Sequence, residues 1–574
     1  MKSLLVYLRN YKKESFFAPL FKMFEAIFEL IVPLVVSSVI DNGILKNDYG
    51  KVLSDVGIMV LLAVVGMTVS VTAQYFAAKA AAGFGRELRS DLFKKIQSLS
   101  FSELDSAGTS TLVTIMTNDT AQVQNGVNMV LRLFLRSPFI VFGALVMAFT
   151  IDVKCALIFL VTIPVLTLVI VGVMKYTMPR YRSIQFHLDD LTLKTRENLS
   201  GARVIRAFTR EAEETEDFYE KNKALSHLQK AVGRISALMN PLTYIIINVA
   251  IIVLIYEGGI RVNVGELSQG QVVALYNYMC QILVELIKLA NLIVTVTRSF
   301  ACASRIENVF KLENTLQHNE NSSKANNYAV CFENVSLKYN GSAEESLKDI
   351  DFKANKGDII GIIGGTGSGK TSLVSLISHF YDATKGTVYV DGVDVKAQDD
   401  NALRNRIGFV LQKAVLFKGT VRENLLWGNK NATDDDMIEA LKNAQVLDTI
   451  NEKGGLDAEI KQNGANLSGG QKQRLSVARA LVRKPEILVL DDSSSALDFA
   501  TEAAMRKAIL NLSYKPTVFI VSQRASSVMF ADLIIVLDDG ECVGCGKHSE
   551  LLKNCGVYRE IYESQFQKEV AADD

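Results

Sequence analysis

The chain has 574 residues, too many for one ordinary domain, and its equal totals of acidic and basic residues give a formal net charge of zero. This balance excludes a strongly basic surface as a global property, so we expect no nucleic-acid partner. Seven scattered cysteines show no regular extracellular disulfide pattern, which favours a reducing cytoplasmic environment. Apolar residues, 49% of the chain, gather in its N-terminal half.

Six apolar stretches in that half are long enough to cross a bilayer as helices, which need about 20 residues each. They lie near residues 16–40, 56–78, 129–150, 155–175, 241–260 and 271–296. The links after the second and fourth stretches are long and mix apolar with charged residues, so we expect them to extend the helices into the cytoplasm. Basic residues before the first stretch and within 180–210 place the N-terminus and these links on the cytoplasmic side.

Several ionisable residues fall inside the predicted spans, where charge is costly. They are Lys22, Glu25, Glu29, Arg132, Arg136, Glu285 and Lys288. Two interpretations stay open. The charges pair between helices or lie near the interface, or a carboxylate of Glu29 or Glu285 faces a substrate cavity that prefers cationic compounds.

A polar, Asn- and Ser-rich segment separates this half from a second half of different pattern. After the segment, strand-like and helix-like stretches alternate, which indicates an α/β domain. We expect a six-helix transmembrane domain at 1–310, a linker at 311–327 and a cytoplasmic α/β domain at 328–574.

The sequence GGTGSGKT at 364–371 lies between an apolar strand-like stretch and an apolar helix-like stretch. Its glycines let backbone amides close around phosphate oxygens at a helix N-terminus, Lys370 supplies positive charge, and the Thr371 hydroxyl can ligate magnesium. The predicted nucleotide-binding residues here are Gly364, Gly365, Thr366, Gly367, Ser368, Gly369, Lys370, Thr371 and Ser372.

Two further motifs follow in the second half. PEILVLDD predicts a strand ending at Asp491, a second anchor for magnesium. NLSGGQKQR places Ser468, Gly469, Gly470 and Gln471 at a helix start, where their donors also suit a phosphate. This second set suggests a dimer, because one chain cannot bring both ends of the same domain to a single phosphate loop.

The phosphate loop, LSGGQ at 467–471 and SALD at 495–498, in this order, resemble ATP-binding cassette exporters that have one six-helix membrane domain and one nucleotide-binding domain per chain. The resemblance implies an α-helical six-span domain fused to an α/β P-loop cassette, with ATP and Mg²⁺ bound between two cassettes. By position, Tyr339 is similar to the aromatic residue that stacks on adenine, and Gln412 to a glutamine that contacts magnesium. Core packing is the alternative role for Tyr339.

The same resemblance implies that Thr371, Gln412 and Asp491 hold Mg²⁺, and that coupling segments lie near 117–124 and 201–210. It also implies a multi-pass protein of the bacterial plasma membrane, surrounded by lipid, with a cytoplasmic cassette. Fusion of the membrane and ATP-binding parts in one chain favours export over import.

Two positions depart from the family pattern. Members that hydrolyse ATP rapidly place glutamate where this chain has Asp492, and histidine where it has Gln523. Aspartate is one methylene shorter, and misplacing a base by about an ångström can cost on the order of a hundredfold in rate. Glutamine can hydrogen-bond a phosphate but cannot become cationic. The pattern resembles the degenerate-site subunit of bacterial heterodimeric multidrug exporters, whose partner supplies Glu and His.

We therefore predict one half of a heterodimeric, ATP-driven exporter of amphipathic drugs or lipids, with ATPase activity mainly in complex with its partner. The alternatives are a homodimeric lipid or peptide exporter that uses Asp492 as the base, and a regulatory subunit that does not hydrolyse ATP. Cys542, Cys545, His548 and Cys555 have the identities of zinc ligands. A second CxxC pair is missing, so we expect no zinc site.

Overall fold

Long helices form the N-terminal half, because apolar chain inside a bilayer can satisfy its backbone hydrogen bonds only internally. The computed structural model describes residues 3–319 and 326–570, and within them six helical segments are long and apolar enough to cross a membrane. They contain α1 (Lys12–Ser38), α2 (Tyr49–Gln97), α5 (Thr120–Leu133) continued by α6 (Arg136–Ile151), α7 (Val153–Ser200), α9 (Glu211–Val264) and α10 (Gln269–Lys311). The prediction of six spans is confirmed.

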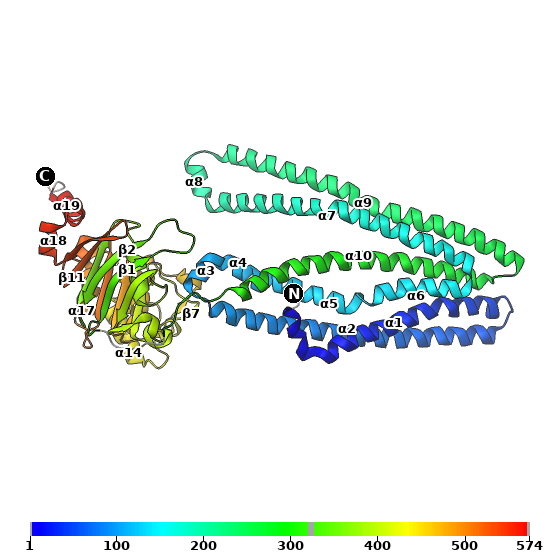
Figure 1. Cartoon of the computed structure of the whole chain (residues 1–574), viewed down its shortest axis with the longest axis horizontal. Helices are drawn as coiled ribbons and strands as arrows, with labels where there is room; N and C mark the ends of the chain where they lie inside the picture. The colour runs from blue at the N-terminus through cyan, green and yellow to red at the C-terminus, as the bar shows by residue number, and fades with distance from the viewer. Residues whose placement is uncertain (1–2, 320–325, 571–574) are drawn as a thin grey trace. The chain divides into compact units, whose positions relative to one another are not determined.

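Shorter turns connect or extend these helices. They are η1 (Leu4–Tyr11), η2 (Val39–Ile44), α3 (Phe101–Ala107), α4 (Thr109–Thr114), η3 (Ile115–Asp119) and α8 (Ala202–Ala207). Helix α9 has 54 residues and therefore spans about 80 Å, far more than the roughly 30 Å of a bilayer core. Helices α7 and α9 pack along one another and are joined by α8 at one end (Figure 1). The expected helical extension of the fourth-to-fifth link is thus present.

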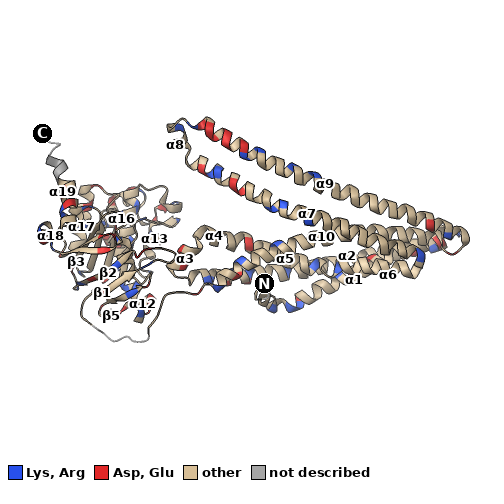
Figure 2. Ribbon diagram, turned by 45° about the horizontal axis from the view of Figure 1, so that its top comes forward, with Lys and Arg blue, Asp and Glu red and all other residues tan. Residues whose placement is uncertain are grey.

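Charged side chains are distributed unevenly along these helices. Figure 2 shows them concentrated toward the ends of α7 and α9, with long uncharged stretches between. Helix α10 packs against α1, α5, α6 and α9, and its Tyr278 is fully buried. The Tyr278 hydroxyl donates a 2.6 Å hydrogen bond to the backbone carbonyl of Leu30 on α1, which satisfies the phenol inside an apolar core. The charges that remain among α1, α6 and α10 therefore stand out from their surroundings.

The C-terminal half is built on a ten-stranded sheet in the order β5-β4-β1-β2-β12-β11-β3-β10-β9-β6. Its strands are β1 (Val330–Leu337), β2 (Leu347–Ala354), β3 (Ile359–Gly364), β4 (Lys385–Val390), β5 (Val393–Asp394), β6 (Ile407–Val410), β9 (Ile487–Asp491), β10 (Thr517–Ser522), β11 (Leu533–Asp538) and β12 (Glu541–Gly546). Strands β6, β9, β10, β3 and β11 run parallel, so their carboxyl ends share one edge. The predicted α/β architecture is confirmed.

Helices cover this sheet and complete two apolar cores. The helices are α11 (Lys370–Ile377), α12 (Asp400–Arg406), α13 (Val421–Leu426), α14 (Asp434–Asn443), α15 (Leu447–Glu452), α16 (Gly469–Leu481), α17 (Phe499–Leu510), α18 (His548–Asn554) and α19 (Gly556–Val570). A small pair, β7 (Gly419–Thr420) with β8 (Glu459–Ile460), lies apart from the main sheet. Residues from α11 and the strands form the first core, whereas α13, α14 and α16 contribute to the second.

The chain divides into two units, and the division is not a single cut. One unit comprises Met1–Gln97 and Ser110–Leu312, and the other comprises Ser98–Thr109 and Glu313–Asp574. The segment with α3 thus packs with the cassette, although it lies in the first long link of the membrane half. Residues 117–124, where a coupling segment is expected, belong to η3 and α5 in the first unit, and Asp119 there pairs with Arg305 of α10 at 2.6 Å. Residues 320–325 of the predicted linker lie outside the described residues.

Candidate functional site

The predicted phosphate loop connects β3 to α11. Gly367 and Gly369 adopt φ angles of 86° and 94°, which L side chains rarely tolerate, and a Cβ at Gly369 would lie 2.6 Å from the carbonyl oxygen of Ser346. The Lys370 ammonium lies within the loop, where it donates to the Gly364 carbonyl at 2.9 Å and to the Ser368 hydroxyl at 3.3 Å. A helix N-terminus, a tight glycine loop and a buried lysine fit a polyphosphate.

The two predicted magnesium anchors meet beside this loop. Thr371 Oγ1 donates a 3.2 Å hydrogen bond to Asp491 Oδ1, and Asp491 is only 1% exposed at the end of β9. Burial and the neighbouring charge of Asp492 raise the pKa of Asp491 above its usual value, while burial lowers the pKa of Lys370. Oxygen donors at a buried carboxylate suit Mg²⁺, so the residues present fit the Mg²⁺–ATP that the sequence predicts.

Asp492 and Gln412 come from neighbouring strands of the parallel edge. Gln412 follows β6, and its Nε2 donates a 3.3 Å hydrogen bond to Asp492 Oδ2. Asp492 adopts a left-handed backbone with φ 46°, which directs the chain away from β9. Gln523 is exposed directly after β10, the strand between β3 and β9. The carboxyl ends of these strands therefore bring the phosphate loop, Asp491, Asp492, Gln412 and the turn at Gln523 to one edge of the sheet.

Tyr339 follows β1 and lies against α11. Its hydroxyl donates to Ser372 Oγ at 2.9 Å, and its ring meets Tyr381 edge-on with centroids 5.0 Å apart. It is partly buried against the first core. The structure thus joins Tyr339 to the phosphate-loop helix, while its contact with adenine stays a prediction.

Ser468, Gly469, Gly470 and Gln471 begin α16, as predicted. The Ser468 hydroxyl accepts from the Gln471 backbone amide at 3.3 Å, and the Gln471 side chain accepts from the Ser468 amide at 3.0 Å. This reciprocal cap leaves the remaining first-turn amides of α16 as donors. A Cβ at Gly470 would approach the Ala496 carbonyl oxygen to 2.9 Å, so glycine allows the helix start to pack against the SALD segment.

The structure adds a set of residues that the sequence interpretation missed. On α3, the Phe101 ring packs against the Phe380 ring at a tilt of 32° with centroids 4.5 Å apart, and Asp105 accepts a 2.6 Å hydrogen bond from the Tyr381 hydroxyl. Thr315 also donates to Glu103 at 2.6 Å. The capping pattern of Ser100 with Glu103 marks the start of α3 in the sequence, but it does not indicate where the helix packs.

His379 precedes these aromatic residues and was not singled out from the sequence. The fully buried imidazole lies between Asp400, at 2.8 Å from Nδ1, and Asp382, at 2.9 Å from Nε2. Burial opposes its positive charge, but the hydrogen bonds and charges of the two aspartates outweigh burial and raise the pKa of His379. The segment that presents Phe380 and Tyr381 to α3 is thus held by an ionic cluster.

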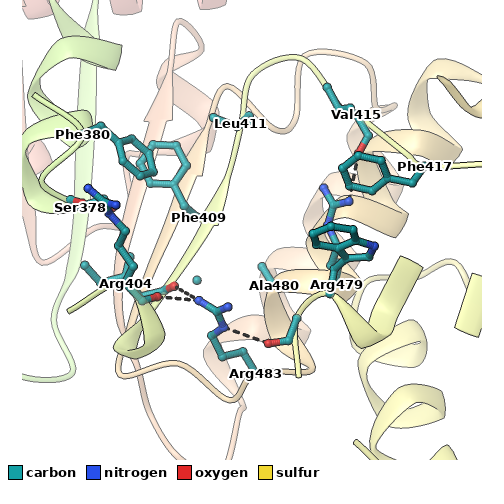
Figure 3. Close-up of a pocket in the computed structure, with 14 residues that line it drawn as sticks. Ser378, Phe380, Arg404, Phe409, Leu411, Val415, Phe417, Arg479, Ala480 and Arg483 are labelled. Atoms are coloured by element: carbon teal, nitrogen blue, oxygen red, sulfur yellow. Dashed lines mark hydrogen bonds between the residues drawn. The ribbon is translucent and has the colours of Figure 1, made fainter. Parts of the chain in front are cut away.

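A pocket of about 480 Å³ lies beside this segment, between α12, β6, α13 and α16 (Figure 3). Phe380 and Phe409 line one side, and the stacked pair of Phe417 and Trp427 lines the other, with centroids 4.6 Å apart. Its floor includes Arg479 and Arg483, which donate to backbone carbonyls. Trp427 is 65% exposed, so this pocket presents an unusual aromatic surface for a soluble domain.

Comparison with known proteins is consistent with this geometry. Residues 15–286 match the family of the ABC transporter transmembrane region, and residues 347–495 match the ABC transporter family. The uncharacterized ABC transporter ATP-binding protein YfiB of Bacillus subtilis is 36% identical over 570 residues, which cover 99% of each chain. The chain therefore belongs to the ABC transporters, as a half-transporter with a transmembrane part and an ATP-binding cassette.

Two further comparisons extend the picture. The putative multidrug export ATP-binding/permease protein YgaD of B. subtilis is 30% identical over 582 residues, covering 98% of this chain and 99% of YgaD. A solved structure of a bacterial Atm1-family ABC exporter with ATP bound has a TM-score of 0.80 at 22% identity, covering 97% of this chain and 98% of that chain. The exporter-type fold is thus confirmed, as is a multi-pass membrane protein with a cytoplasmic cassette.

Proposed function

We propose that the chain is one subunit of a heterodimeric exporter that moves amphipathic drugs or lipids by alternating access. Its phosphate loop, Asp492 and Gln523 contribute to a slow ATP site, completed by the signature segment of the partner. Its own LSGGQ segment completes the partner's faster site, where the partner supplies Glu and His. Thr371, Gln412 and Asp491 hold Mg²⁺ at the slow site.

The observation on which this proposal rests is the environment of Asp492. The carboxylate is one methylene shorter than glutamate, and it is already bound by the Gln412 side chain at 3.3 Å. Both features hold it back from a water molecule at the terminal phosphate, so we expect slow hydrolysis. Gln523 reinforces this expectation, because glutamine cannot provide the positive charge that histidine can.

The proposed coupling between cassette and membrane half uses two aromatic surfaces. Helix α8 ends a long hairpin, and it and the residue after it expose apolar side chains, with Val204 60% and Phe208 71% exposed in this chain. The pocket beside Phe417 and Trp427 is apolar and open enough to accept such a helix from the second chain. Reciprocal insertion in a dimer would bury both surfaces and transmit cassette motion to the helices.

The substrate class follows from similarity and composition rather than from a bound compound. YgaD is named for multidrug export, and the long apolar helices provide a route for amphipathic molecules. Drugs and lipids share this amphipathic character, so we propose the class and no single compound.

ATPase turnover of the purified chain in detergent tests the proposal, alone and mixed with a half-transporter that has Glu and His at the two positions. We expect little turnover alone and strong stimulation in the mixture. Ser468→Ala in this chain should abolish the stimulation, whereas Asp492→Asn should leave most of it. Substantial turnover alone that disappears in Asp492→Asn would instead identify a homodimer with an aspartate base, and no turnover in any mixture would identify a regulatory subunit.

A further inference from the structure

A charged cluster lies inside the membrane half, where α1, α6 and α10 meet. The buried guanidinium of Arg136 binds Glu29 through Nη2 at 2.7 Å and Glu285 through Nη1 at 2.7 Å, with Glu25 3.7 Å from Nε. Lys22 pairs with Glu25, and Lys288 pairs with Glu285 at 2.8 Å. Three carboxylates and three cations therefore neutralise one another, which explains how they persist among apolar helices.

The members of this cluster differ in whether they can meet a ligand. Glu285 is 5% exposed, and both of its oxygens already accept hydrogen bonds, from Arg136, Lys288 and Ser137. Glu29 on α1 and Lys288 on α10 are the exceptions, with side chains 43% and 41% exposed. One negative and one positive group are thus exposed, although Glu29 keeps its contact with Arg136 and Lys288 keeps its contact with Glu285.

Both open groups line a single cavity of about 530 Å³. Its apolar walls include Val32, Val36, Ile140 and Val284. Gln281 also lines it, and the side-chain oxygen of Gln281 is buried without a hydrogen-bond partner among the described residues. An unused buried acceptor is costly, so this oxygen favours a ligand that brings a donor.

We infer that this cavity binds the head of a zwitterionic amphiphile. Its ammonium or other cationic group contacts Glu29 and the Gln281 oxygen, its carboxylate or phosphate contacts Lys288, and its apolar part lies along the valine and isoleucine walls. Because the six charges of the cluster already balance, a simple cation or a simple anion would add an unbalanced charge inside the membrane. A ligand with both charges adds none, and its two groups can contact the exposed parts of Glu29 and Lys288.

This inference rests on the proposed export function, because it names the class of exported compound. It also changes the expectation from the sequence, where Glu29 or Glu285 suggested a preference for cations. Lys288 alters that expectation, since its cationic side chain lines the same cavity, while Glu285 is buried and already accepts three hydrogen bonds.

Binding of two matched dyes to the purified full chain tests the inference without ATP and without a partner chain. Rhodamine 110 is a zwitterion with a free carboxylate, and rhodamine 123 is its cationic methyl ester. Fluorescence polarisation in detergent should show rhodamine 110 binding about tenfold more tightly, the effect of one ion pair of moderate strength. Lys288→Gln should remove this preference by weakening rhodamine 110 alone, and Glu29→Gln should weaken both dyes.

Glu257→Gln on α9 is the matched control, because Glu257 is also ion-paired, to Arg261 at 3.8 Å, but does not line the cavity. Equal affinity for the two dyes in wild type, or the same preference in wild type and Lys288→Gln, would overturn the inference. Lys288→Gln keeps the test valid if Glu29→Gln fails to fold.

Displacement of rhodamine 110 by lysophosphatidylethanolamine would identify a lipid headgroup as the source, and displacement only by zwitterionic drugs would identify a soluble amphiphile. Because the assay involves no nucleotide, failure of the asymmetric ATP sites would leave its result unaffected.

Discussion

The Tyr381 hydroxyl donates a 2.6 Å hydrogen bond to the carboxylate of Asp105 on α3. These residues lie 276 positions apart in the chain, yet both belong to the cassette unit. Beside them, the Phe101 ring packs against the Phe380 ring. The residues that follow the phosphate-loop helix are thus fixed directly to a segment from the first long link of the membrane half.

Tyr381→Phe tests the strength of this attachment. The variant retains the ring but removes the donor and leaves the Asp105 carboxylate without it, so we expect a loss of about 1–3 kcal/mol of local stability. Limited proteolysis should then cut within Ser98–Thr109 faster than in wild type. Tyr219→Phe, at an exposed tyrosine on α9, serves as the control. Equal cleavage rates in wild type and Tyr381→Phe would show that the other contacts of α3, those of Phe101 with Phe380 and of Glu103 with Thr315, hold it without this hydrogen bond.

The raised pKa of Asp491 predicts how Mg²⁺–ATP binding depends on pH. Burial and the charge of Asp492 raise this pKa, and magnesium needs the deprotonated carboxylate. On acidification, the affinity for Mg²⁺–ATP should therefore begin to fall at a higher pH than it would if Asp491 had the usual pKa of an aspartate. Asp492→Asn removes one neighbouring negative charge and should move the midpoint to lower pH. Calorimetric titration with Mg²⁺–ATP at several pH values measures this midpoint. Asp539→Asn serves as the control, because the Asp539 side chain is 93% exposed. An unmoved midpoint in Asp492→Asn would contradict this account.

His379 gives the cassette a second pH dependence, of opposite sign. Despite burial, the two aspartates raise its pKa above the ordinary value of about 6.5, so the folded state favours the imidazolium. The stabilisation by the protonated His379 is complete at pH values below the usual histidine pKa. It is lost as the pH rises through the raised pKa that His379 has in the folded protein. We expect the melting temperature to fall over that interval in wild type and to vary less in His379→Gln. His227→Gln, at an exposed histidine on α9, should behave as wild type. A wild-type slope that persists in His379→Gln would assign the effect to other groups.

Phe208 tests the proposed role of α8. Phe208→Ser removes an exposed aromatic ring that we expect to insert into the partner's cassette, and truncation of such an anchor typically costs about 2 kcal/mol or more. Transport by the two-chain complex in proteoliposomes should fall by about tenfold or more, while basal ATPase activity persists. Phe186→Ser on α7 is a matched control, because Phe186 is also 71% exposed. Normal transport by the Phe208→Ser complex would remove α8 from the coupling path.

The six spans and the phosphate loop could be predicted from the sequence, because each depends on a short stretch of chain: the length of an apolar run in one case and the spacing of glycines in the other. Gln412 and Gln523 were named only by their position in the family pattern; that they share one edge with Asp491 follows from the order of the parallel strands, which only the structure gives. The position of α3 could not be predicted, because it depends on aromatic contacts between distant segments. The same holds for Arg136. Its charge was visible in the sequence, but its simultaneous contacts with Glu29 and Glu285 depend on how three helices pack.

Because Ser98–Thr109 folds with the residues after Glu313, the cassette is not contiguous in the gene. A cassette expressed from residue 313 onward would lack α3 and would expose the Phe380 ring and the Tyr381 hydroxyl to water. Supplying residues 98–109 as a synthetic peptide, or fusing them ahead of residue 313 through a flexible tether, would restore the missing piece. Measurements on a cassette that begins at residue 313 would therefore be made without the contacts that α3 contributes.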